Sequence, residues 1–192
     1  VIPHIDGDYA NLVFPDFVGL YGHDHFKASM AALKLFTQYG SSEFAIREFL
    51  KRDFNKTIAV MKKWADDENH HVRRLASEGS RPRLPWSFKL DAVVKNPALT
   101  LPILERLKSD EELYVRKSVA NHLNDFSKDH AGLLVQTVKK WDLTHEHTAW
   151  IVKHACRTLI KKGDAAALAI FAFEKDTRVA VKDFRLTENT IK

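Results

Sequence analysis

The hydrophobic positions of this chain recur with a helical period along nearly its whole length. In residues 25–37 the apolar side chains fall on one face of a helix, which Gly40 would end. Ser41 and Ser42 are suited to cap the next helix, because serine hydroxyls accept hydrogen bonds from its first amides. The same period continues in residues 44–50, 57–64, 72–78, 88–94, 99–107, 114–126, 132–141, 147–160 and 165–173. The pattern therefore predicts an all-α chain.

The predicted helices are paired and repeated. Three similar tetrads, HVRR at residues 71–74, YVRK at 114–117 and WIVK at 150–153, each open a helix that follows a shorter helix and a polar turn. Their starts lie 43 and 36 residues apart, a spacing typical of HEAT-type helix pairs, which stack into a right-handed solenoid. In such an α–α superhelix the second helix of each pair lines the concave surface, so the basic tetrads would align there. A row of cations on a concave surface suits the backbone of a nucleic-acid duplex.

The two ends of the chain depart from this pattern. Residues 1–22 are weakly patterned, with Pro15 among them, and we expect a partly helical lead-in. Residues 23–175 form the predicted HEAT-like repeat domain. In the tail, residues 176–192, partial alternation of apolar and polar side chains predicts a short strand at 179–186. Because a lone strand is unstable, it either docks on the helices or begins a second domain.

Composition narrows the class of protein. The 45% apolar fraction is too high for a disordered chain, and a single cysteine excludes a disulfide scaffold. No apolar run approaches the roughly 20 residues of a membrane span, and no leader pattern marks secretion, so we expect a cytoplasmic protein. The net charge of +5 and the pI near 9.2 permit a nucleic-acid partner without requiring one.

The most unusual segment is LASEGSRPRLPW at residues 75–86, which has almost no core-forming pattern. Its one carboxylate, Glu78, stands at a predicted helix C-terminus, where the helix dipole disfavours negative charge. A nearby arginine or a cationic ligand must compensate. The structural alternative is that Arg81 or Arg83 pairs with Glu78 while Trp86 covers the core.

A second polar segment occupies the helix predicted at residues 114–126. Its candidate residues are Arg116, Lys117, Asn121, Asn124 and Asp125. Asn121 and Asn124 lie three residues apart and therefore on one side of the helix, although asparagine is a poor helix former. A binding role, a solvated face and hydrogen bonds between helices all remain open for them. Asp125 could instead cap the end of the helix.

A third stripe combines aromatic and cationic side chains. Trp150, His154 and Arg157 follow one face of the helix that also carries Lys153. This stripe could hold a base by stacking and a phosphate by charge. The alternative is that Trp150 packs between helices while the other side chains are exposed.

Histidine clusters raise the hypothesis of a metal-dependent hydrolase. The clusters lie at residues 23–25, 70–71 and 145–147, and none has the spacing of an HExxH motif. We therefore predict no metal site. Cys156 lies in an apolar stretch and is expected to be a small core residue rather than a nucleophile.

The segments at residues 72–86, 114–125 and 150–164 resemble those of the bacterial DNA alkylation-repair proteins with HEAT-like repeats, in particular the AlkC-like branch, to which AlkD is related. The resemblance covers residues 25–173. It implies a DNA glycosylase that removes cationic N3-alkylated bases, such as 3-methyladenine, by hydrolysis of the N-glycosidic bond without cofactor or metal. Longer members of the branch carry an immunoglobulin-like C-terminal domain, whose first strand the tail resembles.

The resemblance also implies roles for individual residues. The catalytic carboxylate of the family falls on Glu78, and a DNA-facing arginine falls on Arg116. This chain has Arg157 where the sister branch has its second pocket tryptophan. The aromatic wall would then come from Trp86 or Trp150. Because an N3-alkylated purine is already cationic and needs no general acid, the carboxylate would stabilise the developing oxocarbenium sugar.

We accordingly predict Glu78 as the catalytic residue, facing outward from the curved stack into a rim of cations. The predicted DNA- and substrate-binding residues are Arg74, Arg81, Arg83, Trp86, Arg116, Lys117, Asn121, Asn124, Asp125, Trp150, Lys153, His154 and Arg157. The expected partner is double-stranded DNA with alkylated bases, with no membrane and no obligate protein partner, in a bacterial cytoplasm and on the nucleoid when bound to DNA. The alternative function is a non-catalytic HEAT-repeat module that binds DNA or protein.

Overall fold

The computed structural model describes residues 10–172, and every regular element in this part of the chain is a helix. The α-helices are α1 (Val13–Tyr21), α2 (Phe26–Phe36), α3 (Glu43–Arg52), α4 (Phe54–Trp64), α5 (His70–Gly79), α6 (Asp91–Lys95), α7 (Leu101–Leu107), α8 (Leu113–Phe126), α9 (Ala131–Val138), α10 (Glu146–Ala155), α11 (Arg157–Lys161) and α12 (Ala165–Ile170). The 3-10 helices are η2 (Ala10–Leu12), η3 (His23–His25) and η4 (Pro97–Thr100). The strand expected at 179–186 lies outside the described residues. Within residues 10–172, no helix has the length and apolar character that a membrane span requires.

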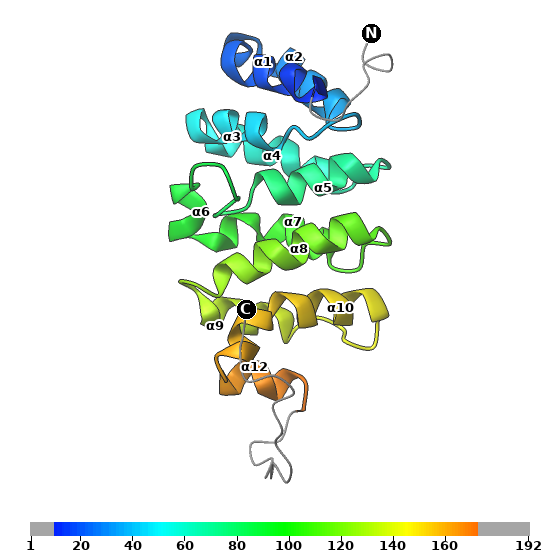
Figure 1. The fold of residues 1–192 in the computed structure, drawn as a ribbon, viewed down its shortest axis with the longest axis vertical. Coiled ribbons are helices and arrows are strands. Elements are labelled where there is room, and N and C mark those ends of the chain that lie inside the picture. Colours follow the sequence, from blue (N-terminus) through cyan, green and yellow to red (C-terminus); the bar gives the residue numbers. More distant parts are fainter. Residues whose placement is uncertain (1–9, 173–192) are drawn as a thin grey trace, which may run out of the picture.

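The helices stack along the long axis of the molecule in two layers (Figure 1). In one layer, which we call the front layer, α3, α5, α8 and α10 follow one another, and each contacts the next. Behind it, α4 contacts α7, and α9 packs on α8. At the N-terminal end, α1 contacts α2 and α3 and so continues the stack. The predicted all-α, HEAT-like repeat architecture is confirmed.

The core lies between the two layers and follows the predicted apolar spacing. In α8, Val115, Val119 and Leu123 recur every four residues and are fully buried. Val72 in α5 and Ile151 in α10 are fully buried in the same way. Burial of each such side chain stabilises the fold by roughly 1.5–3 kcal/mol. Each helix that begins with a tetrad therefore has one continuous apolar stripe, and these stripes hold the helices side by side.

The turn before each tetrad helix closes in the same way. The Oδ1 atoms of Asp67, Asp110 and Asp142 each accept a hydrogen bond from the amide two residues later, at 3.1, 2.9 and 2.9 Å. Arg73 and Arg116 reinforce two of these turns, because the Nη1 of each donates to the carbonyl groups five and six residues before it. Arg73 also donates to Asp110 from Nε at 2.7 Å and from Nη2 at 3.1 Å, and so joins one turn to the next. The repeats thus share contacts as well as spacing.

The start of α3 differs from its prediction. Ser42 occupies the N-cap position, but its hydroxyl donates to the carbonyl of Leu33 at 3.0 Å instead of accepting from the helix amides. Ser41 donates to Glu43 at 2.6 Å. Both serines therefore hold the turn between α2 and α3 in place, and neither caps α3.

Several predicted helices have boundaries other than those expected, and two of them lie next to predicted site residues. The helix expected at 88–94 begins only at Asp91, because residues 80–90 form a loop. The helix expected at 147–160 breaks at Cys156, which separates α10 from α11. Cys156 is fully buried, as expected of a core residue, and burial raises the pKa of its thiol to about 11.

Candidate functional site

Glu78 lies in the last turn of α5 and is largely buried, with only 6% of the residue exposed. The Nη1 of Arg81 donates to Glu78 Oε1 at 2.7 Å, and the Nη2 of Arg74 lies 3.8 Å from the same oxygen. The prediction that Glu78 faces outward is therefore wrong. The physical reason is the arginine three residues later, which draws the carboxylate inward and compensates for the unfavourable helix dipole. The catalytic role of Glu78 stays a prediction.

Arg81 joins Glu78 to a second carboxylate. Its Nε donates to Asp125 Oδ2 at 3.0 Å, and its Nη2 donates to Asp125 Oδ1 at 3.3 Å. Asp125 belongs to α8 and is itself buried. The three residues form what we call the Glu78–Arg81–Asp125 cluster, which links α5 to α8. The alternative in which Arg81 pairs with Glu78 is thereby confirmed, and Asp125 does not act as a helix cap.

Burial and charge act in opposite directions within this cluster. Burial alone lowers the pKa of Arg81, but the hydrogen bonds and charges of Asp125 and Glu78 outweigh it, and the pKa is raised. Burial raises the pKa of Asp125, and the hydrogen bond from Arg81 offsets only part of this effect. With all three groups ionised, their charges sum to one negative charge, which the guanidinium of Arg74, 3.8 Å from Glu78 and shared with Glu43, offsets in part. Two carboxylates held in this way suit a reacting centre that becomes positive.

The loop at residues 80–90 presents Trp86 to solvent. Trp86 is 97% exposed, and its φ of 61° is one that a non-glycine residue rarely adopts. Its ring therefore does not cover the core, contrary to the alternative considered from the sequence. The ring borders an open hollow of about 670 Å³ that side chains of α1 and α3 also line. Arg83, on the same loop, forms a salt bridge with Asp129.

The two asparagines of α8 form hydrogen bonds between helices, one of the alternatives that the sequence left open. The Nδ2 of Asn124 donates to the carbonyl of Ala155 at 2.7 Å and to Thr158 Oγ1 at 3.0 Å. The Oδ1 of Asn121 accepts from Arg157 Nη2 at 3.0 Å. These contacts join α8 to the end of α10 and to α11, and they offset the low helix propensity of asparagine.

The aromatic stripe on α10 is occupied by contacts within the protein. The rings of Trp150 and His154 stack with centroids 4.9 Å apart and planes inclined by 9°. The guanidinium of Arg116 lies 5.9 Å from the Trp150 ring, and Arg157 donates to the His154 carbonyl at 2.7 Å. Trp150 is therefore already stacked, and it offers less free aromatic surface to a base than Trp86 does.

Two cations of the tetrads are exposed on the front layer. Lys117 on α8 and Lys153 on α10 hold the tetrad position that Arg74 holds on α5. Among residues 10–172, neither lysine has an ion-pair partner. Arg116, to which the resemblance gave a DNA contact, uses its Nη1 on the turn carbonyls described above. The two lysines are therefore freer to meet a phosphate than Arg116 is.

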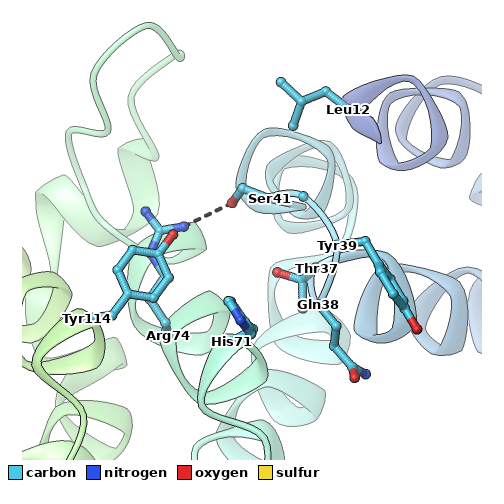
Figure 2. A pocket seen from close by; sticks show the side chains of 9 residues that line it. Leu12, Thr37, Gln38, Tyr39, Ser41, His71, Arg74 and Tyr114 are labelled. Atoms are coloured by element: carbon cyan, nitrogen blue, oxygen red, sulfur yellow. Dashed lines mark hydrogen bonds between the residues drawn. The ribbon is translucent and has the colours of Figure 1, made fainter. Parts of the chain in front are cut away.

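Arg74 borders a hollow of about 400 Å³. Figure 2 shows Arg74, Tyr114 and His71 on one side of it and the turn between α2 and α3 on the other. The Nη1 of Arg74 donates to Ser41 Oγ at 2.9 Å and pairs with Glu43, while its guanidinium lies 4.6 Å from the Tyr114 ring. Because Glu43 neutralises Arg74, this hollow is a weaker site for a phosphate than the exposed lysines.

Two buried polar residues near the cluster are not among those predicted from the sequence. Arg47 of α3 and His122 of α8 are both fully buried. Arg47 directly follows the core residue Ile46, and His122 directly precedes the core residue Leu123. Each of these two polar residues adjoins the apolar stripe of its helix in the sequence. That position is the signal from which their burial could have been predicted.

The metal hypothesis has no geometric support in the part of the chain that the structure describes. No three side chains of His, Cys, Asp or Glu come together there in a way that could hold a metal ion. The rings of His70 and His71 instead contact each other at a tilt of 34°, with centroids 4.2 Å apart, and His147 lies 3.4 Å from Glu146.

Comparison with known proteins adds sequence relatives. A family model described as "DNA alkylation repair enzyme" matches residues 37–159. The Bacillus subtilis (strain 168) protein named "Uncharacterized protein YhaZ" is 53% identical over 181 residues, which cover 94% of this chain and 50% of that protein. The chain thus spans about half the length of the curated relative that it matches.

Solved structures with a similar fold include the following two. The Pseudomonas fluorescens alkylpurine DNA glycosylase AlkC, bound to DNA containing an abasic site analogue, is 55% identical with a TM-score of 0.87, over 88% of this chain and 48% of that one. AlkD2 from Streptococcus mutans is 24% identical with a TM-score of 0.62, over 81% of this chain and 83% of that one, and shows the fold alone. The predicted resemblance to the AlkC-like branch is confirmed. With the family model matching more than half of its residues, the chain belongs to the DNA alkylation repair enzyme family.

Proposed function

We propose that this chain is the catalytic repeat domain of a DNA glycosylase that releases cationic N3-alkylated bases, such as 3-methyladenine, from double-stranded DNA. The observation that carries the proposal is the Glu78–Arg81–Asp125 cluster, in which Arg81 holds a largely buried carboxylate between α5 and α8, in the layer that also carries the exposed Lys117 and Lys153. The similarity to AlkC, an alkylpurine DNA glycosylase by name, supports the same function. The similarity spans 88% of this chain and 48% of AlkC. Action on DNA would place the protein in a bacterial cytoplasm, on the nucleoid.

The reaction needs a carboxylate that stabilises positive charge on the sugar, and it needs no general acid to protonate the leaving base. An N3-alkylated purine already carries a positive charge and leaves as a neutral base when the N-glycosidic bond breaks. The bonding electrons go to the base, and the sugar becomes an oxocarbenium ion that water then attacks. A carboxylate near C1′ stabilises this ion electrostatically and can orient the water. We assign that role to Glu78.

Glu78 would meet the sugar through the oxygen that Arg81 leaves free. Oε1 accepts the hydrogen bond from Arg81, whereas no donor among the described residues bonds Oε2. Oε2 is not sealed from solvent. Arg81 would thus hold the carboxylate in one orientation while its second oxygen stays available. A pre-oriented charge of this kind needs no reorganisation during the reaction.

DNA binding would depend on exposed groups around this cluster. Lys117 and Lys153 are free to contact phosphates, which gives affinity without sequence preference. Trp86 offers a free aromatic face to a nucleobase. Stacking and cation–π attraction to an alkylated base contribute about 0.5–2 kcal/mol. The other predicted binding residues are engaged in contacts within the protein and would act mainly by holding these groups in place.

The test is release of bases from N-methylated duplex DNA, with the product identified by mass spectrometry. Glu78→Gln keeps the size of the side chain and removes its charge. We expect it to lower single-turnover release of 3-methyladenine by about tenfold or more, while DNA affinity stays within about threefold. The matched control is Glu68→Gln, which neutralises an exposed carboxylate in the turn before α5 and should release the base at the wild-type rate. Unchanged release by Glu78→Gln rejects the role assigned to Glu78.

The burial of Glu78 favours a second candidate, a non-catalytic module that binds DNA. In that case the ion pair with Arg81 is purely structural, as most such pairs are. The same assay separates the two candidates. A wild-type protein that binds DNA with a strong salt dependence but leaves no abasic sites would support the module over the glycosylase.

A further inference from the structure

Arg47 of α3 is a fully buried arginine that bonds to backbone rather than to a carboxylate. Its Nη1 donates to the carbonyl of Gly79 at 3.0 Å and to that of Arg81 at 2.7 Å, and its Nη2 donates to the carbonyl of Phe88. Burial lowers the pKa of Arg47 to about 10, and the nearby charge of Arg81 adds to this effect. Burying a cation without a carboxylate partner is costly. The segment that Arg47 binds should therefore depend on it.

The three carbonyl groups lie at the two ends of the loop at residues 80–90. Gly79 is the last residue of α5 before the loop, Arg81 stands at the start of the loop, and Phe88 stands near its end. Arg47 therefore closes the loop as a clamp. Two backbone hydrogen bonds inside the loop, at 3.3 and 3.1 Å, complete its closure.

This loop carries two of the groups on which the proposed function depends. Arg81 places the Glu78 carboxylate, because it donates to it at 2.7 Å. Trp86 is the exposed aromatic residue of the loop, in a left-handed conformation that costs about 1–3 kcal/mol in a residue other than glycine. Such a conformation persists only where the surrounding contacts enforce it. The clamp provides such contacts from the interior.

We propose that Arg47 is a positioning residue of this site: its clamp fixes the backbone of Arg81, and through Arg81 the orientation of the Glu78 carboxylate, together with the placement of Trp86. The catalytic consequence rests on the proposed glycosylase function, whereas the clamp can be tested without it. A misplacement of about 1 Å in a reacting group can cost about 100-fold in rate. A residue that never touches DNA would thus control base release.

The test compares Arg47→Met with a control that loses similar contacts elsewhere. Arg47→Met keeps an apolar stem and removes every donor. We expect the hydrogen-bonded loop amides of Arg81, Ser87 and Leu90 to exchange with deuterium about tenfold faster or more, while the amides of α8 and α10 stay protected. We also expect single-turnover base release to fall about tenfold or more, with DNA affinity within about threefold. Arg73→Met is the control, because Arg73 also donates to two backbone carbonyls but in the turn before α5.

The control should lower the melting temperature while loop exchange and base release stay at wild-type values. Unchanged loop exchange and release in Arg47→Met overturn the proposal. An equal loss of release in Arg73→Met also overturns it, because lost stability then explains both. If Arg47→Met does not fold, Arg47→Lys replaces it. Arg47→Lys keeps the positive charge but loses the guanidinium group that bonds several carbonyls at once. Amide exchange and base release at wild-type rates in Arg47→Lys would overturn the proposal. If the wild-type protein releases no base, the glycosylase proposal fails, and the exchange comparison alone decides on the clamp.

Discussion

His122 joins three elements around the site through one buried ring. Its Nδ1 donates to the carbonyl of Ser77 on α5 at 2.9 Å, and its Nε2 lies 3.1 Å from the hydroxyl of Thr100 in η4. Burial lowers the pKa of His122 to about 3, and the charges of two nearby arginines act in the same direction. The ring is therefore neutral at physiological pH, with a proton on the nitrogen that faces the carbonyl.

We predict that His122 makes the protein less stable as the pH falls from about 6.5 toward 3. The unfolded chain takes up a proton near the ordinary histidine pKa of 6.5, whereas the folded protein resists protonation until about 3. Within that window each pH unit removes about 1.4 kcal/mol from the free energy of unfolding. His122→Gln keeps a donor and an acceptor at this position. In urea unfolding of this variant, the free energy of unfolding should fall less steeply with falling pH, and the difference in slope should correspond to about one bound proton. Equal slopes would mean that the folded protein accommodates a charged ring.

We predict that DNA shields Trp86 from an aqueous quencher. Trp64 and Trp141 are buried and Trp150 is half-buried, so acrylamide reaches Trp86 most readily. Quenching of wild-type fluorescence should decrease when duplex DNA is added, and Trp86→Phe should show little of this change. Because base stacking contributes about 1–3 kcal/mol, Trp86→Ala should weaken DNA binding by about tenfold. Quenching that is unaffected by saturating DNA would contradict a contact at Trp86.

At the scale of single elements, the sequence predicts the features that follow from the spacing of its apolar and repeated residues. The core face of α8 follows from the spacing of Val115, Val119 and Leu123, all of which are buried. The repeated turns follow from aspartates at equivalent positions, such as Asp67 and Asp110. Hydrophobic spacing fixes the face that a helix buries, and it leaves open which polar groups meet across helices.

The site itself depends on contacts that no local pattern contains. Asp125 lies 44 residues from Arg81 in the chain, and Arg47 lies 41 residues from Phe88. Both contacts exist only because α3, α5 and α8 stack in one layer. The apolar pattern predicts a helix that includes Phe88, whereas in the structure a distant arginine holds the carbonyl of Phe88 in a loop.

We predict that Gly79 marks a close approach of α5 to its neighbours that tolerates no side chain. A Cβ at this position would lie 2.5 Å from Ile46 Cγ2 and 3.3 Å from Met61 Cε. Gly79→Ala should lower the free energy of unfolding by about 1–3 kcal/mol. Gly132→Ala in α9 is the matched control, since a Cβ there meets no described atom within 4 Å, and it should be neutral or stabilising by up to about 1 kcal/mol. Urea denaturation measures both, and a neutral Gly79→Ala would show that Ile46 gives way.

At the scale of the whole molecule, basic side chains recur along the front layer because successive repeats carry one at the same position. Arg74, Lys117 and Lys153 occupy one tetrad position on three stacked helices. Glu43 neutralises the first of them, so the free positive charge of this row lies on α8 and α10. The Glu78–Arg81–Asp125 cluster joins α5 to α8 within the same layer. The distribution of charge over the helices therefore says more about where DNA could bind than the net charge of the chain does.

We predict that this row sets the salt dependence of DNA binding. The double variant Lys117→Ala/Lys153→Ala should bind DNA more weakly, and the slope of log K against log salt should become shallower by about two. The control pair Lys62→Ala/Lys63→Ala removes two exposed lysines from α4, in the other layer, and should leave the slope nearly unchanged. Titrations by fluorescence anisotropy at several salt concentrations measure both. An equal change in the control pair would indicate general attraction rather than a defined row.

Cys156 gives the molecule a practical property. It is the single cysteine of the chain, and it is fully buried with its thiol pKa raised to about 11. At neutral pH this sulfur stays protonated and out of reach of maleimides and disulfide reagents. A cysteine placed anywhere on the surface would then be the one that reacts. Spin labels, fluorophores or thiol-modified oligonucleotides can therefore trace the path of DNA across the front layer in an otherwise native background.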